Sequence, residues 1–228
     1  MDEPTQITLR DGSRALVRPI APTDRWRLVE GLKLLSEQSR FRRFHSPMPR
    51  FTDAQLDYLT DVDGVDHAAW VALDPTRPEH PGLGVARYVR VADEPEVAEA
   101  AITVVDEAQG LGLGTQLLGV LADVARRNGI AVFRNYVLAE NTAMLDVFDA
   151  LGGTRELETP GLYRVDLRVP AGDVPLPDTA AGRAFAAAAR REGGQLGRTT
   201  PPVWLRDETG EIELARLQAW LEERAPEP

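Results

Sequence analysis

The stretch VVDEAQGLGLGTQLL (104–118) joins the end of a predicted strand to a glycine-rich turn and the start of a helix. Apolar residues at helical spacing predict that this helix covers 113–127, where an Asn-Gly pair ends it. Three glycines alternate in the turn: Gly110, Gly112 and Gly114. Glycines here let the backbone approach a ligand closely, and the free amides of the first helical turn point outward. The stretch therefore predicts an anion site, and phosphates are the usual occupants of such sites.

Three glycine patterns that bind phosphates can be compared with this turn. The nucleotide P-loop needs a lysine, but Lys33 is the sole lysine of the chain. The dinucleotide fingerprint GxGxxG fails because neither starting glycine places a third glycine at the required position. A third pattern, Gln/Arg-x-x-Gly-x-Gly/Ala, is matched by Gln109, Gly112 and Gly114. A glycine-rich turn without any ligand remains the structural alternative.

The rest of the chain alternates between strands and helices. Residues 7–20 predict a hairpin about an Asp-Gly turn. Further strands are expected at 67–74, 84–91, 97–105, 130–138 and 162–169. Helices are expected at three more places: after Thr23 or Asp24 with Leu28, Val29, Leu32 and Leu35 at helical spacing, from Thr52, and over 141–153. A meander followed by alternating helices and strands predicts an α/β (α+β) fold with a mixed sheet and helices on its faces.

Composition excludes several classes of site. A formal charge of −10 disfavours a nucleic-acid partner, because a phosphate backbone attracts clustered cations. With no cysteine, the chain cannot form disulfides, zinc-thiolate sites or a covalent cysteine intermediate. His45, His67 and His80 are too far apart for metal-ligand spacing, so we expect no metal site. No apolar run is long enough to span a membrane and no signal peptide is visible, so we expect a cytoplasmic protein.

The order of elements, with the glycine turn in its middle, resembles the GNAT family of acyl-coenzyme A dependent N-acyltransferases. The resemblance covers residues 7–169 and is closest to the catalytic domain of bacterial Pat-type protein lysine acetyltransferases. It rests on LRDGSRALVRPIAPTD, LSEQSRFRRFHSP, TDVD and AEAAITVVDEAQGLGLG. The resemblance implies a mostly antiparallel twisted sheet with helices on both faces, and acetyl-CoA as co-substrate without a metal.

The resemblance also implies which residues contact coenzyme A. Backbone amides from 111 to 115 would hold its pyrophosphate, and the end of the strand 97–105 would pair with its pantetheine arm. The residues concerned are Val104, Val105, Gln109, Gly110, Leu111, Gly112, Leu113, Gly114, Thr115 and Asn141. For Asn141, at the head of a helix, an ordinary helix cap is an equal alternative.

Acyl transfer to an amine needs a general base, because an alkyl amine such as lysine has a pKa near 10.4 and is protonated at neutral pH. Glu99 lies ten residues before Gln109, where the Pat-type pattern also has a glutamate. We expect Val97, Ala100 and Ala101 to give its carboxylate apolar surroundings, which raise a pKa. The alternatives are that Glu99 is a solvated acid, or that His45 is the base.

Two positions depart from the family pattern. Phe148 stands where many relatives have a tyrosine that protonates the leaving thiolate, so solvent or the amine must supply that proton. Gly153 stands where an aromatic residue is common, which leaves the packing of the helix end open. In the cluster SRFRRFH (39–45), an acceptor groove is one interpretation; Phe41 and Phe44 in the core, with three solvated arginines, is the other.

The sequence therefore predicts an acetyltransferase domain over 1–170 and a helical carboxy-terminal extension over 171–228, which packs on the domain or on a second subunit of a homodimer. We expect direct transfer from acetyl-CoA to a primary amine, with a protein lysine as the favoured acceptor. A small-molecule amine is the rival acceptor. A non-catalytic module that binds acyl-CoA is the alternative from another class.

Overall fold

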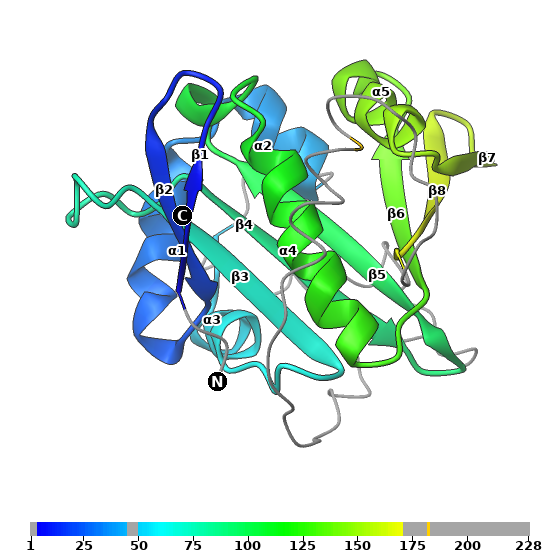
Figure 1. The fold of residues 1–228 in the computed structure, drawn as a ribbon, viewed down its shortest axis with the longest axis horizontal. Helices are drawn as coiled ribbons and strands as arrows, with labels where there is room; N and C mark the ends of the chain where they lie inside the picture. The colour runs from blue at the N-terminus through cyan, green and yellow to red at the C-terminus, as the bar shows by residue number, and fades with distance from the viewer. Residues whose placement is uncertain (1–3, 45–49, 171–181, 183–228) are drawn as a thin grey trace.

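The computed structural model describes residues 4–44, 50–170 and 182 of the chain and contains one eight-stranded sheet with the order β1-β2-β3-β4-β5-β6-β8-β7 (Figure 1). The strands are β1 (Thr5–Thr8), β2 (Arg14–Pro19), β3 (His67–Leu73), β4 (Gly84–Val91), β5 (Glu94–Val104), β6 (Val132–Leu138), β7 (Thr154–Thr159) and β8 (Leu162–Arg168). The predicted helical extension, 171–228, lies outside the described residues apart from one position.

Neighbouring strands run antiparallel at every step of the sheet except one, the parallel pair β5 and β6. The predicted amino-terminal hairpin is confirmed, with Thr8 opposite Arg14 across the turn. Gly12 has φ +85° in that turn, a conformation that glycine adopts without steric cost. The expected mixed and mostly antiparallel sheet is therefore correct.

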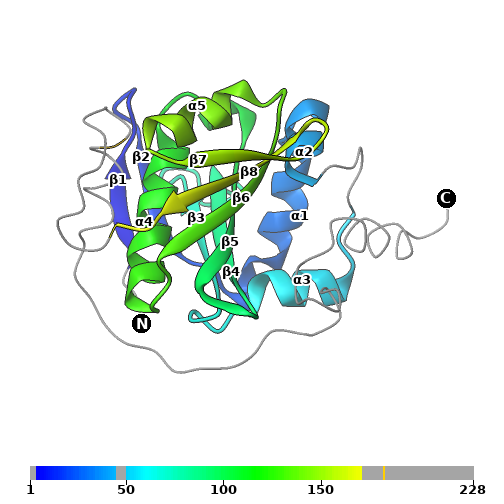
Figure 2. The same cartoon turned by 90° about the vertical axis from the view of Figure 1, so that its right-hand side faces the viewer.

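Helices cover both faces of the sheet, as Figure 2 shows. They are α1 (Arg25–Lys33), α2 (Glu37–Phe44), α3 (Asp53–Thr60), α4 (Leu113–Arg127) and α5 (Thr142–Ala150), with short 3-10 turns η1 (Pro22–Asp24) and η2 (Asp106–Ala108). Helix α4 packs on β3, β4 and β5, while α1 and α3 lie on the opposite face. Within the described ranges, no helix has the length and apolarity that crossing a membrane requires.

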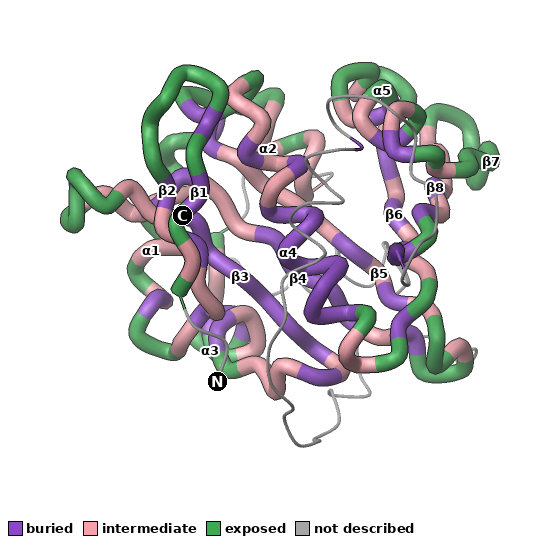
Figure 3. Tube along the Cα trace, viewed as in Figure 1, coloured by how far each residue is buried: buried purple, intermediate pink, exposed green. Residues whose placement is uncertain are grey.

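Most of the core lies between α4 and the sheet (Figure 3). The four residues of α4 that were expected to point inward are at most 4% exposed: Leu117, Leu118, Leu121 and Val124. On β5, Ala98 and Ala100 are buried in the same cluster. Since side chains alternate along a strand, Glu99 and Ala101 point to the other face of the sheet, where α1 and α3 lie.

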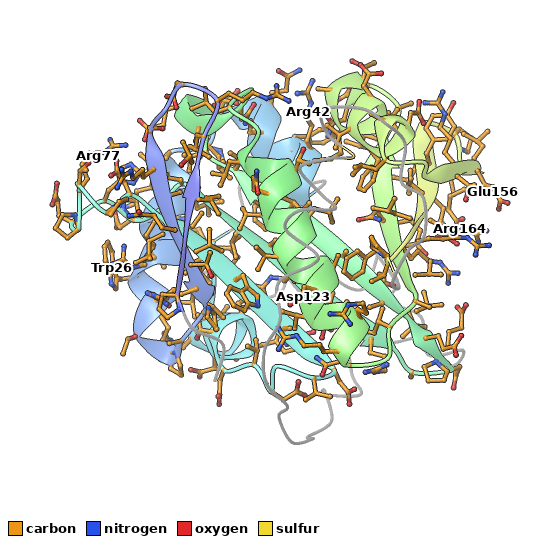
Figure 4. All side chains as sticks on the ribbon, viewed as in Figure 1. Trp26, Arg42, Arg77, Asp123, Glu156 and Arg164 are labelled. Carbon is orange, nitrogen blue, oxygen red and sulfur yellow. The ribbon has the colours of Figure 1, made fainter. Side chains whose placement is uncertain are left out.

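The structure corrects several details of the sequence prediction. It adds α2 and β7, which the sequence patterns did not reveal. Phe41, expected in the core, is 42% exposed, and Val29, one of the periodic apolar residues of α1, is 36% exposed. Trp26 also points outward from α1 (Figure 4). Asp24 does begin α1, but its side chain caps no helix amide and instead pairs with Arg18 and Arg27.

The end of α5 explains the glycine at position 153. Gly152 has φ +81°, and the N–H of Gly153 donates to the carbonyl of Phe148, as in a Schellman motif. A Cβ atom at Gly153 would meet that carbonyl oxygen at 3.1 Å and a methyl group of Val165 at 3.2 Å. A larger residue at 153 would therefore displace Phe148, which is only 2% exposed.

Replacing Phe148 with alanine should destabilise the protein by about 3 kcal/mol, because truncating a buried aromatic residue leaves a cavity in the core. Denaturant unfolding measures the change. The matched control is Phe41→Ala, which removes the same ring from an exposed position and should change stability by less than about 0.5 kcal/mol. Equal losses in the two variants would contradict the assignment of Phe148 to the core.

Candidate functional site

The sheet opens between β5 and β6. These strands pair only over Val97–Glu99 and Val132–Arg134, although both continue well beyond that ladder. On its other edge β5 stays paired with β4 as far as Val104, and the N–H of Val105 donates to Leu83 at 3.0 Å. Because backbone groups alternate between the two edges of a strand, the peptide groups of Ile102 and Val104 face the opening.

The glycine turn lies at the end of this opening and supplies free amides. Gly110 and Gly112 have φ +74° and +83°, and Gly112 is the N-cap of α4. The first helical amide to reach a carbonyl is that of Gln116, which donates to Gly112 at 3.2 Å. The amides of 113–115 thus have no partner within the helix and form its positive end. A Cβ atom at Gly114 would lie 3.8 Å from Val104, so these amides stand beside the last residue of β5.

Arg10 supports the glycine turn from the amino-terminal hairpin. Its N–H donates to the carbonyl of Leu111 at 3.1 Å, and its guanidinium donates to the carbonyl of Gly110 at 3.4 Å. A Cβ atom at Gly112 would approach the Arg10 side chain to 3.3 Å. Sequence reasoning missed Arg10, because no local pattern links two segments that lie a hundred residues apart.

The side chain of Gln109, an exposed residue, links the turn to α2. Its amide donates to the Val104 carbonyl at 3.1 Å, to Asp106 at 2.9 Å and to the Ser39 hydroxyl at 3.2 Å. Asp106 also accepts from the Ser39 hydroxyl at 2.6 Å and from the Ser36 N–H at 2.8 Å. Burial acts to raise the pKa of Asp106, but these hydrogen bonds hold it below its usual value. Gln109 therefore positions the turn.

Glu99 lies where β5 and β6 part, at the last paired position of the ladder. It is half-buried and, by alternation with the buried Ala98 and Ala100, faces the side of the sheet opposite α4. The apolar surroundings expected for its carboxylate are only partly correct, because Ala100 points to the opposite face and Arg134 stands across from Glu99 on β6. Arg134 is engaged by Glu94 at 2.6 Å and Asp166 at 3.2 Å, and the Glu94 carboxylate is the main reason that its pKa is raised.

Asn141 and Phe148 lie on α5. Asn141 is the N-cap of this helix, yet its side chain makes no capping hydrogen bond; its backbone N–H donates to Leu138 instead. An ordinary side-chain cap is therefore not what the structure shows. Phe148 is buried in the core and has no proton to donate. His45 lies outside the described residues, and in the part of the chain that the structure does describe, no three potential metal ligands come together.

A family model described as "Acetyltransferase (GNAT) domain" matches residues 14–154. The acetyltransferase Pat of Mycolicibacterium smegmatis is 35% identical over 170 residues, which is 75% of this chain and 50% of that protein. The acetyltransferase PA5475 of Pseudomonas aeruginosa is 38% identical over 145 residues, 64% of this chain and 77% of that protein. The crystal structure of the GNAT domain of S. lividans PAT superposes with a TM-score of 0.67 at 33% identity, covering 72% of this chain and 96% of that one. The chain thus spans about half the length of the M. smegmatis relative.

Proposed function

The chain belongs to the GNAT family of acetyltransferases, and on that premise we propose that it transfers the acetyl group of acetyl-CoA to the side-chain amine of a protein lysine. That it is an acyltransferase follows from the family. One observation carries the proposed site. The opening between β5 and β6 has the free amides of α4 at one end and Glu99 at the other.

The residues of the opening suit coenzyme A in a definite order. The amides of 111–115 would hold the pyrophosphate, because unpaired N–H groups and the helix dipole both favour negative charge. The open edge of β5 offers the amide-rich pantetheine arm the peptide groups of Ile102 and the N–H of Val104, which β6 does not use, while the Val104 carbonyl already accepts from Gln109. The side chain of Asn141, which makes no capping hydrogen bond, would contact the coenzyme from the start of α5. The N–H of Val105 donates to the Leu83 carbonyl, so Val105 would help to fix the end of β5 that pairs with the pantetheine arm.

Glu99 is positioned to act as the general base. The acceptor amine would approach from the face that α1 and α3 cover, since the carboxylate of Glu99 lies on that side. Glu99 would take a proton from the ammonium group directly or through one water. The freed amine then attacks the thioester carbonyl carbon, the carbon–sulfur bond breaks, and the nitrogen releases its second proton to solvent as the amide forms. Because Phe148 has no proton to give, the thiolate takes its proton from solvent, which a leaving group with a pKa near 8.5 tolerates.

Support for a protein lysine as the acceptor comes from the likeness to the Pat enzymes. A small-molecule amine would use the same chemistry, and an acyl-CoA-binding module would use the same pocket without turnover. Release of free thiol from acetyl-CoA, measured with lysine peptides and with small amines, separates these three outcomes. The proposal requires faster release with the peptides than with the small amines.

Binding of coenzyme A should depend on Gly112. In Gly112→Glu, bulk and negative charge enter the place of the pyrophosphate, and losing hydrogen bonds to a charged group weakens binding by roughly 10- to 100-fold. Isothermal titration calorimetry measures the affinity. Gly129→Glu is the matched control, because Gly129 also has a positive φ, +75°, but lies at the far end of α4. An unchanged affinity in folded Gly112→Glu would refute this placement of the pyrophosphate.

Turnover should depend on the carboxylate of Glu99. Glu99→Gln keeps the size of the side chain but cannot take the proton, so kcat should fall by about 10² to 10⁴ with little change in acetyl-CoA affinity. Part of the loss should return at high pH, where the amine loses its proton unaided. Glu96→Gln alters an exposed glutamate on the same strand and should leave the rate unchanged. A wild-type rate for Glu99→Gln near neutral pH would move the base elsewhere.

A tyrosine at position 148 tests which proton transfer limits the rate. Phe148→Tyr adds a hydroxyl donor while preserving the ring. If removal of the amine proton limits turnover, the change should alter kcat by less than about threefold, because the thiolate leaves readily. A larger acceleration would show that protonation of the thiolate is the slow step. The rate is measured under saturating acetyl-CoA, with protein stability checked in parallel.

A further inference from the structure

A pocket opens on the face of the sheet that Glu99 shares, between the helices α1, α2 and α3 and the strands β3, β4 and β5. Its walls are largely apolar, with Leu28 and Leu32 from α1 and Phe44 from α2. Three arginines also line it: Arg27 from α1, which pairs with Asp24, Arg43 from α2 and Arg87 from β4. Charged side chains in an apolar pocket are costly unless an opposite charge accompanies them.

Arg87 is a buried cation at the wall formed by the sheet. It is only 7% exposed, and its guanidinium lies 3.1 Å from His67 Nε2 and donates to the Leu59 carbonyl at 3.1 Å. Burial and the charge of Arg87 lower the pKa of His67 to about 3, so the ring is neutral and accepts from Arg87. These two contacts use two of the five N–H donors of a guanidinium, and both partners are uncharged.

Arg43 brings a second positive charge to the same pocket. It is half-buried, and its guanidinium lies 5.0 Å from the centre of the Phe44 ring. Burial lowers the pKa of Arg43 to about 10; burial and the nearby charge of Arg43 lower that of Arg87 to about 10. Both therefore stay protonated at neutral pH. In the described ranges 4–44, 50–170 and 182, neither forms an ion pair with a carboxylate, whereas Arg134 on the same face of the sheet has two.

The pocket lies next to the place where the acceptor amine would meet Glu99. Across β4 and β5, Arg87 stands opposite Ala101 and Val89 stands opposite Glu99. Arg87 and Glu99 are thus diagonal neighbours on one face, a spacing of about 7–8 Å between Cα atoms. The coenzyme would enter along the open edge of β5, so a group in this pocket would belong to the acceptor.

We propose that Arg43 and Arg87 bind a carboxylate carried by the acceptor, so that the enzyme favours amines with an acidic group close by. The pocket supplies an apolar channel for the stem of that group and two guanidinium forks for its charged end. The carboxylate could come from a glutamate beside the target lysine or from a free amino acid. The assignment to the acceptor rests on the proposed acetyl transfer, but the binding of a carboxylate can be tested without it.

The binding test uses the full chain with butyrate, which has an apolar stem and one carboxylate, against butyramide, its neutral counterpart, at constant ionic strength. Butyrate should raise the thermal unfolding midpoint saturably, and butyramide should not. The shift should disappear in Arg43→Gln and Arg87→Gln and persist in Arg14→Gln, an exposed arginine on β2. Without butyrate, Arg43→Gln should be at least as stable as wild type, because it removes an unpaired charge. Equal shifts in Arg43→Gln and wild type, or none in wild type, would overturn the site, even if Arg87→Gln fails to fold.

A second experiment tests the acceptor by comparing kcat/KM within two pairs of substrates. One pair is a lysine peptide with glutamate or with glutamine beside the lysine, and the other is free lysine and its carboxamide. In one of these pairs, the acidic member should be favoured by about tenfold or more in wild type, as for a charge-assisted hydrogen bond, and by much less in Arg43→Gln. The pair that responds identifies the source of the carboxylate. Turnover without any preference would overturn the assignment to the acceptor. If no amine is acetylated, the proposed function fails, while the butyrate test still decides the pocket.

Discussion

Hydrogen bonds between β5 and β6 stop at Glu99, and the rest of the site depends on that short ladder. A longer ladder would occupy the peptide groups of Ile102 and Val104 and close the sheet beneath α4. Strand β6 does not lose its pairing by leaving β5, because it pairs with β8 along its whole length, Val132–Leu138. Where β6 diverges from β5, the buried side chain of Asn135 donates hydrogen bonds to the carbonyls of Phe133 and Val165. The opening therefore leaves β6 paired along its other edge.

Long-range contacts hold the glycine turn in place at the mouth of this opening. Asp106 and Gln109 tie the turn to α2 through Ser39, and Arg10 ties it to the amino-terminal hairpin. The turn needs these supports because two of its glycines have a positive φ and the chain there makes few helical hydrogen bonds. The amides that would bind phosphate are therefore fixed relative to α2, a helix on the acceptor side. The proposed sites of both substrates would thus be linked by one hydrogen-bonded cluster.

The two faces of the central strands carry different chemistry. The side under α4 is apolar, with Ala98 and Ala100 buried against the helix. The side under α1 and α3 holds charged or titratable residues at alternate positions: Glu99, Arg87, Arg134 and His67. The period of two along each strand separates the core under α4 from the face that carries these residues. Two carboxylates neutralise Arg134, and these ion pairs link neighbouring strands of the sheet. The charge of Arg87, in contrast, faces a pocket.

The sequence by itself determined the elements whose signals are local. Helical spacing gave α4 over the predicted range 113–127, and the capping box at Thr52 gave the start of α3. The glycine turn was likewise recognisable as a local pattern, whereas Glu99 was singled out only through the resemblance to the Pat-type enzymes. Only the tertiary structure decided where β6 leaves β5, that Arg10 supports the turn, and that Arg43 lies in a pocket while Phe41 lies at the surface. These features arise from packing between segments distant in sequence, and the energy of such contacts has no signature in the local pattern of either segment.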